Sequence, residues 1–69
     1  MTRYLVIYER SEDAWGAYSP DLPGCVAAGA TREEVETLMT GAVEQHLHVM
    51  RENGMPVPKP ASFPGFVAA

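Results

Sequence analysis

The fold is decided by residues 18–25, which read Tyr18-Ser19-Pro20-Asp21-Leu22-Pro23-Gly24-Cys25. Pro20 and Pro23 hold φ at about −65° and favour extended conformations in the residues before them. Gly24 can adopt the positive φ that a chain reversal often needs. On both sides of this stretch lie runs of residues that are typical of strands. We therefore predict that residues 18–25, the corner, form a rigid turn between two strands of one sheet.

Two side chains of the corner allow more than one interpretation. The Asp21 carboxylate can accept hydrogen bonds from main-chain N–H groups two or three residues on, which makes it a turn former. Leu22 is apolar in a polar turn, so it either folds back as a plug on the core, which we favour, or stays outside for a partner. The residues that we predict to be structural or partner-binding are Tyr18, Pro20, Asp21, Leu22, Pro23 and Gly24.

Length and composition indicate a single small domain that needs additional stabilisation. The chain has 69 residues, of which 46% are hydrophobic and 20% charged, as in globular proteins. A domain of this size buries only about 60% of the surface that its unfolded chain exposes. Cys25 is the single cysteine, so an internal disulfide is excluded. We therefore expect a homo-oligomer, either a dimer or a tetramer, with a two-fold dimer as the simplest form.

Charge and the first residues narrow the class of partner. Nine acidic and five basic residues give a net charge of −4, which argues against a phosphate-binding surface and favours a neutral or basic partner. The apolar run near the N-terminus is too short for a signal sequence or a membrane span. We expect a cytoplasmic protein that does not bind membranes.

Three short strands are predicted before a helix. Tyr4–Tyr8 is rich in β-branched and aromatic residues, with Tyr4, Val6 and Tyr8 on one face and Leu5 and Ile7 on the other. A polar hairpin connection over residues 9–13 leads to a second strand at 14–18, and a third follows the corner at 25–28. The predicted fold is α+β: a three-stranded antiparallel meander, one long helix and a short C-terminal strand.

The helix is predicted over residues 31–53. Thr31 can cap its first turn while Glu34 reaches back in a capping box, and Asn53-Gly54 provides the stop. Apolar residues recur every three or four positions in one stripe: Val35, Leu38, Met39, Ala42, Val43, His46, Leu47 and Met50. Such a helix is longer than the ~17 Å of a five-residue strand, so part of the stripe needs another neighbour. The candidates for an oligomer interface are Met39, Val43, His46 and Met50.

Beyond the helix, the sequence alternates proline with other residues. Residues 55–60, the strap, contain three prolines and are predicted to run extended in a polyproline-like conformation. Phe63 and Phe66 follow in a segment where a disordered chain would rarely need two aromatics. We expect residues 63–67 to form a short strand or hook at the sheet edge.

No residue pattern indicates catalysis, a cofactor or a metal site. His46 and His48 point about 160° apart on a helix and cannot chelate one ion together. Cys25 lies among alanine and valine, which favours a buried structural thiol over an activated nucleophile. Asp21 and the carboxylates of residues 9–13 are better explained by a turn and a solvated loop than by magnesium binding. We therefore expect a binding protein rather than an enzyme.

The chain resembles the N-terminal domain of HicB-like antitoxins over residues 3 to 60. The resemblance rests on several motifs: the strand Tyr4–Tyr8, Trp15-Gly16-Ala17-Tyr18 before Pro20-Asp21-Leu22-Pro23-Gly24-Cys25-Val26, Gly29-Ala30-Thr31 opening a helix with Glu33-Glu34, and then His46-Leu47, Gly54 and Pro56-Val57-Pro58. The proline corner followed by this helix start is fairly specific as a pair.

The resemblance implies a partial ribonuclease-H-like fold, β-β-β-α-β, and a type II antitoxin that neutralises a small basic ribonuclease toxin of the HicA type. Such antitoxins are not nucleases. Many relatives continue into a DNA-binding domain, whereas this chain stops at Ala69, so we expect no direct DNA binding by this chain alone. The alternative function is an orphan structural oligomer of the same fold without a toxin.

Overall fold

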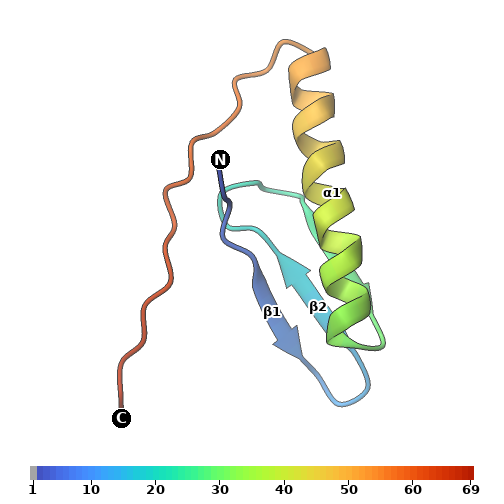
Figure 1. Cartoon of the computed structure of the whole chain (residues 1–69), viewed down its shortest axis with the longest axis vertical. Coiled ribbons are helices and arrows are strands. Elements are labelled where there is room, and N and C mark those ends of the chain that lie inside the picture. Colours follow the sequence, from blue (N-terminus) through green and yellow to red (C-terminus); the bar gives the residue numbers. More distant parts are fainter. Residues whose placement is uncertain (1) are drawn as a thin grey trace.

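The computed structural model describes residues 2–69, which form a three-stranded sheet followed by one helix (Figure 1). The elements are β1 (Ile7–Arg10), β2 (Trp15–Tyr18), β3 (Val26–Gly29) and α1 (Arg32–Glu52). Both strand pairs are antiparallel and the spatial order is β1-β2-β3. The predicted α+β meander with one long helix is confirmed.

The first strand begins at Ile7 rather than at Tyr4, which corrects the predicted boundary. In the ladder of β1 and β2, Ile7 lies opposite Tyr18. The same register would place Leu5 opposite Pro20, which has no N–H to donate. The Leu5 carbonyl instead accepts a hydrogen bond from the Ser19 hydroxyl at 2.9 Å. The proline of the corner therefore ends the β1–β2 ladder.

The hairpin between β1 and β2 is tighter than predicted. Glu9 and Arg10 belong to the strand, and the connection runs over residues 11–14. The N–H of Ser11 donates to the carbonyl of Ala14 at 2.9 Å and closes the turn. The third strand is also shifted by one residue and ends at Gly29. These shifts leave the predicted order and direction of the strands unchanged.

The core lies between one face of the sheet and the first half of α1. Its buried residues are Ala17, Leu22, Cys25, Val35 and Met39, and Tyr4, Val6 and Tyr8 pack against them. The predicted faces of the first strand are thus confirmed, because the alternation places Leu5 and Ile7 on the opposite side. That opposite face also carries the exposed side chains of Tyr18 and Val26, which are cross-strand neighbours.

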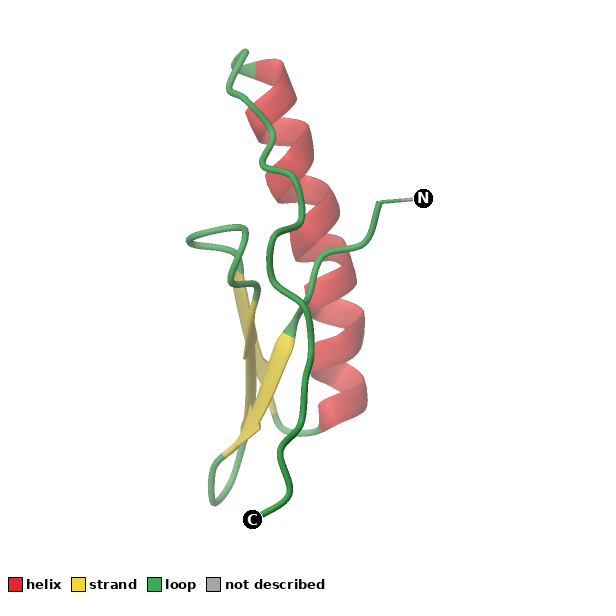
Figure 2. Cartoon of the chain, turned by 90° about the vertical axis from the view of Figure 1, so that its left-hand side faces the viewer, coloured by secondary structure: helices red, strands yellow, loops and turns green. Residues whose placement is uncertain are grey.

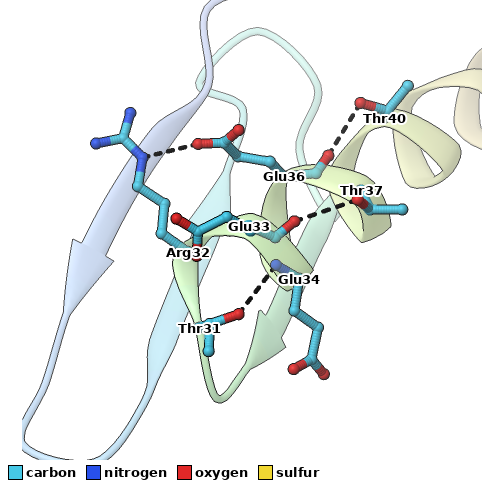
Figure 3. Close-up of polar contacts among 7 residues, drawn as sticks. All are labelled: Thr31, Arg32, Glu33, Glu34, Glu36, Thr37 and Thr40. Carbon is cyan, nitrogen blue, oxygen red and sulfur yellow. Dashed lines mark hydrogen bonds and ion pairs between the residues drawn. The ribbon is translucent and has the colours of Figure 1, made fainter.

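Helix α1 has the predicted ends. Thr31 is the N-cap, and its Oγ1 accepts a hydrogen bond from the N–H of Glu34 at 3.1 Å (Figure 3). The Glu34 carboxylate packs over Gly29, where a Cβ atom would come within 3.0 Å of it. Asn53 caps the other end, and Gly54 follows with φ of 65°. Figure 1 shows that the second half of α1 extends past the sheet.

Within the described residues, the chain after Gly54 forms neither a helix nor a strand. Residues 55–60, the strap, turn back from the end of α1 and run extended, as predicted. Residues 61–69, the tail, continue along the β1 side of the molecule (Figures 1 and 2). The prediction of a terminal strand is wrong for this structure. Four prolines between positions 56 and 64 lack the N–H groups that a ladder with β1 would require.

Candidate functional site

The corner is a closed loop around Leu22, whose side chain is only 1% exposed. The N–H of Leu22 donates to Ser19 O at 3.2 Å, and the N–H of Cys25 donates to Leu22 O at 3.0 Å. Gly24 has φ of 85°, the positive value that the reversal needs. Leu22 is therefore the plug on the core that we favoured, and its alternative as an exposed contact for a partner does not hold.

Asp21 has a different role from the predicted turn former. Its Oδ2 accepts hydrogen bonds from the N–H groups of Ala61 and Ser62, both at 3.1 Å, and its Oδ1 accepts one from the Ser62 hydroxyl at 3.0 Å. The Ala61 N–H, with help from Ser62, lowers the pKa of Asp21 and outweighs the opposing effect of desolvation. We call these three bonds the Asp21 latch. They tie the corner to the tail.

A second bond holds the strap. The Tyr4 hydroxyl donates to the carbonyl of Pro58 at 2.6 Å. Proline carbonyls in an extended segment have no partner within their own segment, so a side chain from the start of the sheet satisfies this one. Tyr4 and Asp21 together fix the strap and the tail beside β1. Neither contact could be predicted from sequence, because the paired residues lie 40 to 54 positions apart.

A groove of about 1470 Å³, the edge groove, lies between the start of the sheet, the second half of α1 and the strap. Its apolar walls include Tyr4, Val6, Val43, Leu47, Val57 and Pro58. Each of these side chains is only part-buried. The groove thus exposes the apolar surface that the short sheet leaves uncovered.

The four predicted interface residues separate into two groups. Met39 is 1% exposed inside its own chain's core, where it contacts no solvent and leaves no surface for a second copy. Val43 lines the edge groove, and His46 and Met50 are part-buried further along α1. The interface candidates that remain are therefore those of the second half of the helix.

The hairpin and the start of α1 lie at the same end of the molecule. The Arg32 guanidinium sits 5.1 Å from the ring centre of Tyr8 and 5.9 Å from that of Trp15, within the range of cation–π contacts. Its Nε also donates to Glu36 at 2.9 Å (Figure 3). The sequence analysis missed this cluster, although Arg32 follows the N-cap directly. Arg32 joins the helix start to the first two strands.

Most of the carboxylates gather at this end, which we call the acidic end. The exposed acidic residues there are Glu9, Glu12, Asp13, Glu33, Glu34 and Glu36. The basic residues at this end are Arg10 and Arg32, and the Arg32 side chain already forms an ion pair with Glu36. The acidic end therefore carries most of the negative charge that the composition predicted.

The remaining candidate residues are not brought together. Burial raises the pKa of the Cys25 thiol, which favours its protonated form over the reactive thiolate. His48 lies 3.7 Å from Glu52 on the exposed side of α1, whereas His46 is part-buried. Across residues 2–69, no three His, Cys, Asp or Glu side chains gather where they could hold a metal ion. The described part of the chain also has no helix long and apolar enough to cross a membrane.

Comparison with known families identifies the chain. The family model described as HicB_like antitoxin of bacterial toxin-antitoxin system matches residues 4–69, nearly the whole chain. The chain belongs to the HicB-like antitoxin family. Comparisons with curated proteins and with solved structures gave no match. The match confirms the resemblance inferred from the corner and the helix start, and it implies that this HicB-like chain interacts with a toxin.

Proposed function

We propose that this HicB-like antitoxin binds and neutralises a small basic ribonuclease toxin of the HicA type in the cytoplasm. The observation that carries the proposal is the family match over residues 4–69. The chain acts by binding and not by catalysis, since its carboxylates serve the latch, the helix start and the solvated hairpin. An orphan oligomer without a toxin is the alternative that the experiment below distinguishes.

The acidic end supports a basic partner. Six exposed carboxylates face solvent over the hairpin and the first turns of α1, and two arginines offset part of their charge. Charge of one sign on a small surface attracts an oppositely charged protein and speeds its association, most strongly at low salt. The acidic end is therefore our proposed contact surface for the toxin.

The test uses the basic protein encoded by the reading frame next to the antitoxin gene. We expect the two proteins to co-purify and the toxin's ribonuclease activity to fall as the antitoxin is added. Charge reversal of Glu12 and Asp13 to Lys should weaken binding by roughly tenfold or more at low salt and by less at high salt. Both side chains lie in the hairpin turn, so the fold should be unaffected.

The matched control places the same change of charge elsewhere. Glu44→Lys with Glu52→Lys alters the net charge equally on the second half of α1 and should leave the affinity nearly unchanged. An equal loss of affinity in both double variants would mean that overall charge, rather than the acidic end, decides binding. Absence of an adjacent basic protein, or no binding to it, would favour the orphan oligomer.

We also propose that the chain forms a homo-oligomer, a dimer or a tetramer. The support is the uncovered apolar surface: the edge groove, the part-buried second half of α1 and the exposed face with Tyr18 and Val26. Val43, His46 and Met50 are the helix residues proposed for this interface. Light scattering at micromolar concentration should give a multiple of the 7.5 kDa chain mass, and a monomer would exclude this part of the proposal.

The isolated chain is not expected to bind duplex DNA. Its five basic residues do not form one surface: Arg3, Arg51 and Lys59 border the edge groove together with Glu44, whereas Arg10 and Arg32 lie among the carboxylates of the acidic end. DNA affinity depends on several lysines and arginines that neutralise neighbouring phosphates together. A fluorescence titration with upstream DNA at about 150 mM salt should show no binding below micromolar concentration. Tight binding by the antitoxin alone would contradict this expectation.

A further inference from the structure

The tail carries apolar side chains that its own chain leaves in solvent. Phe66 is 97% exposed and Val67 is 95% exposed. Single exposed apolar residues are common on protein surfaces, but here an aromatic and a β-branched residue are adjacent in an extended segment. No hydrogen bond holds residues 63–69 among the contacts of the described chain. The tail is thus fixed by hydrogen bonds at the Asp21 latch and by none beyond it among the described residues.

The edge groove is a second place where the chain leaves apolar surface uncovered. Its part-buried walls are apolar and the charged residues Arg3, Glu44, Arg51 and Lys59 border them. Its volume of about 1470 Å³ exceeds the ~300–1,000 Å³ of typical small-molecule sites. A chain segment with bulky side chains fits such a groove better than a small ligand does.

The tail does not fill the groove of its own chain. Phe63 and Pro64 already form part of the groove rim, and the chain continues away from it. Figures 1 and 2 show the chain end level with the β1–β2 hairpin, whereas the groove is walled by the opposite, second half of α1. The Asp21 latch fixes this direction, because it anchors Ala61 and Ser62 beside the corner.

The chemistry of the side chains indicates which molecule occupies the groove. No charged side chain follows Lys59, and the exposed side chains of Phe66 and Val67 are apolar. A basic toxin would be recognised by the acidic end and offers no match for this segment. A second copy of the chain supplies both the apolar side chains of a tail and the apolar walls of a groove.

We propose that Phe66 and Val67 of one copy seat in the edge groove of a second copy, and that the exchange is reciprocal. Each copy then contributes one tail and one groove, as two-fold symmetry requires. The groove is incomplete without the partner's side chains. This inference rests on the proposed self-association, and it names the segment that creates the interface.

The test is cross-linking between copies of different mass. One copy carries Glu44→Cys at the groove wall, and a second, tagged copy carries Ala68→Cys in the tail, which leaves Phe66 and Val67 in place. The native Cys25 is buried, which disfavours its reactive thiolate in both. After the copies are mixed, a short bis-maleimide should give a cross-linked heterodimer. Thr37→Cys, an exposed position of α1 outside the groove, replaces Glu44→Cys in the control and should give none.

A second variant measures the contribution of the aromatic side chain. Phe66→Ser should raise the dissociation constant of the dimer by roughly 30-fold, the effect of removing an interface anchor. Leu38→Ser, at an exposed apolar position that does not line the groove, should change it by less than about threefold.

Each outcome supports or overturns the exchange. Cross-linking that occurs only within one chain carrying both cysteines would show that the tail binds its own groove. A dimer in light scattering without the heterodimer product would overturn the exchange and leave self-association standing. A monomeric wild-type chain would overturn both. None of these results depends on toxin binding, which the charge-reversal experiment tests separately.

Discussion

The two halves of helix α1 belong to one element but have different surroundings. In the first half, Val35 and Met39 are 0% and 1% exposed against the sheet and the corner. In the second half, Val43 and Leu47 are part-buried, and Val49 is 43% exposed. The cause is length: a helix of 21 residues spans about 31 Å and strands of four residues about 13 Å.

Because their apolar side chains differ in burial, the two halves of α1 contribute differently to the fold. The first half, together with Leu22 of the corner, forms the closed core that holds the fold. The second half and the strap line the edge groove, whose exposed apolar surface is our proposed site of self-association. The comparison predicts different responses to the same substitution in the two regions.

The largest effect is expected from truncating the plug. Leu22→Ala should lower the free energy of unfolding by about 2–5 kcal/mol, because the side chain is fully buried and leaves a cavity. Leu47→Ala, the same substitution at the part-buried groove, should lower it by less than half as much in the monomer. Urea unfolding of both variants at low concentration measures the pair. Equal losses of unfolding free energy in the two variants would show that the corner and the groove do not differ as a closed and an open region.

A smaller effect is expected from two glycines with positive φ. Gly24 and Gly54 both have free space around a built Cβ, so strain alone decides the cost of a side chain. Gly24→Ala should destabilise by about 1–3 kcal/mol, because hydrogen bonds on both sides of the loop prevent relaxation. Gly54 is also flanked by hydrogen bonds, from its own N–H to Arg51 O and from Met55 N–H to Met50 O, but these lie at a helix end that can fray. Gly54→Ala should therefore cost about 1 kcal/mol, the low end of the left-handed penalty. Thermal unfolding measures the stability of both variants. A larger loss of stability for Gly54→Ala than for Gly24→Ala would show that the corner is not the more constrained of the two turns.

The smallest effect concerns the Asp21 latch and its dependence on pH. The latch lowers the pKa of Asp21 from 3.8, so its contribution is present above that value and is lost as pH falls through the folded-state pKa. We expect the NMR signals of the Ala61 and Ser62 amides to shift together with a midpoint below 3.8. In Asp21→Asn this transition should disappear. A midpoint at or above 3.8 in the wild type would show that the latch does not form in solution.

Local signals account for what could be predicted from sequence. Thr31 and Asn53-Gly54 mark the helix ends, and the corner separates the second and third strands, so element order and core position follow. The start of β1 depends on the pairing register with β2, which places Leu5 opposite Pro20. The sequence of β1 alone does not specify that register. The Asp21 latch and the edge groove join segments distant in sequence, and no local pattern specifies such contacts.

The tail shows the opposite error. Two aromatics within four residues suggested a strand, and the prolines around them were given too little weight. Their missing N–H groups prevent regular pairing with β1. Phe66 and Val67 are then left for a different kind of contact, packing of side chains in a groove.

The most direct test of the division between a closed core and an open binding region is amide hydrogen exchange at two protein concentrations. At low concentration, amides of Val35 to Met39 should already be strongly protected, and those of residues 43–51 and 65–67 much less. At high concentration, protection should rise in the latter two segments and stay constant in the former. Protection that is uniform along α1 and independent of concentration would contradict the account.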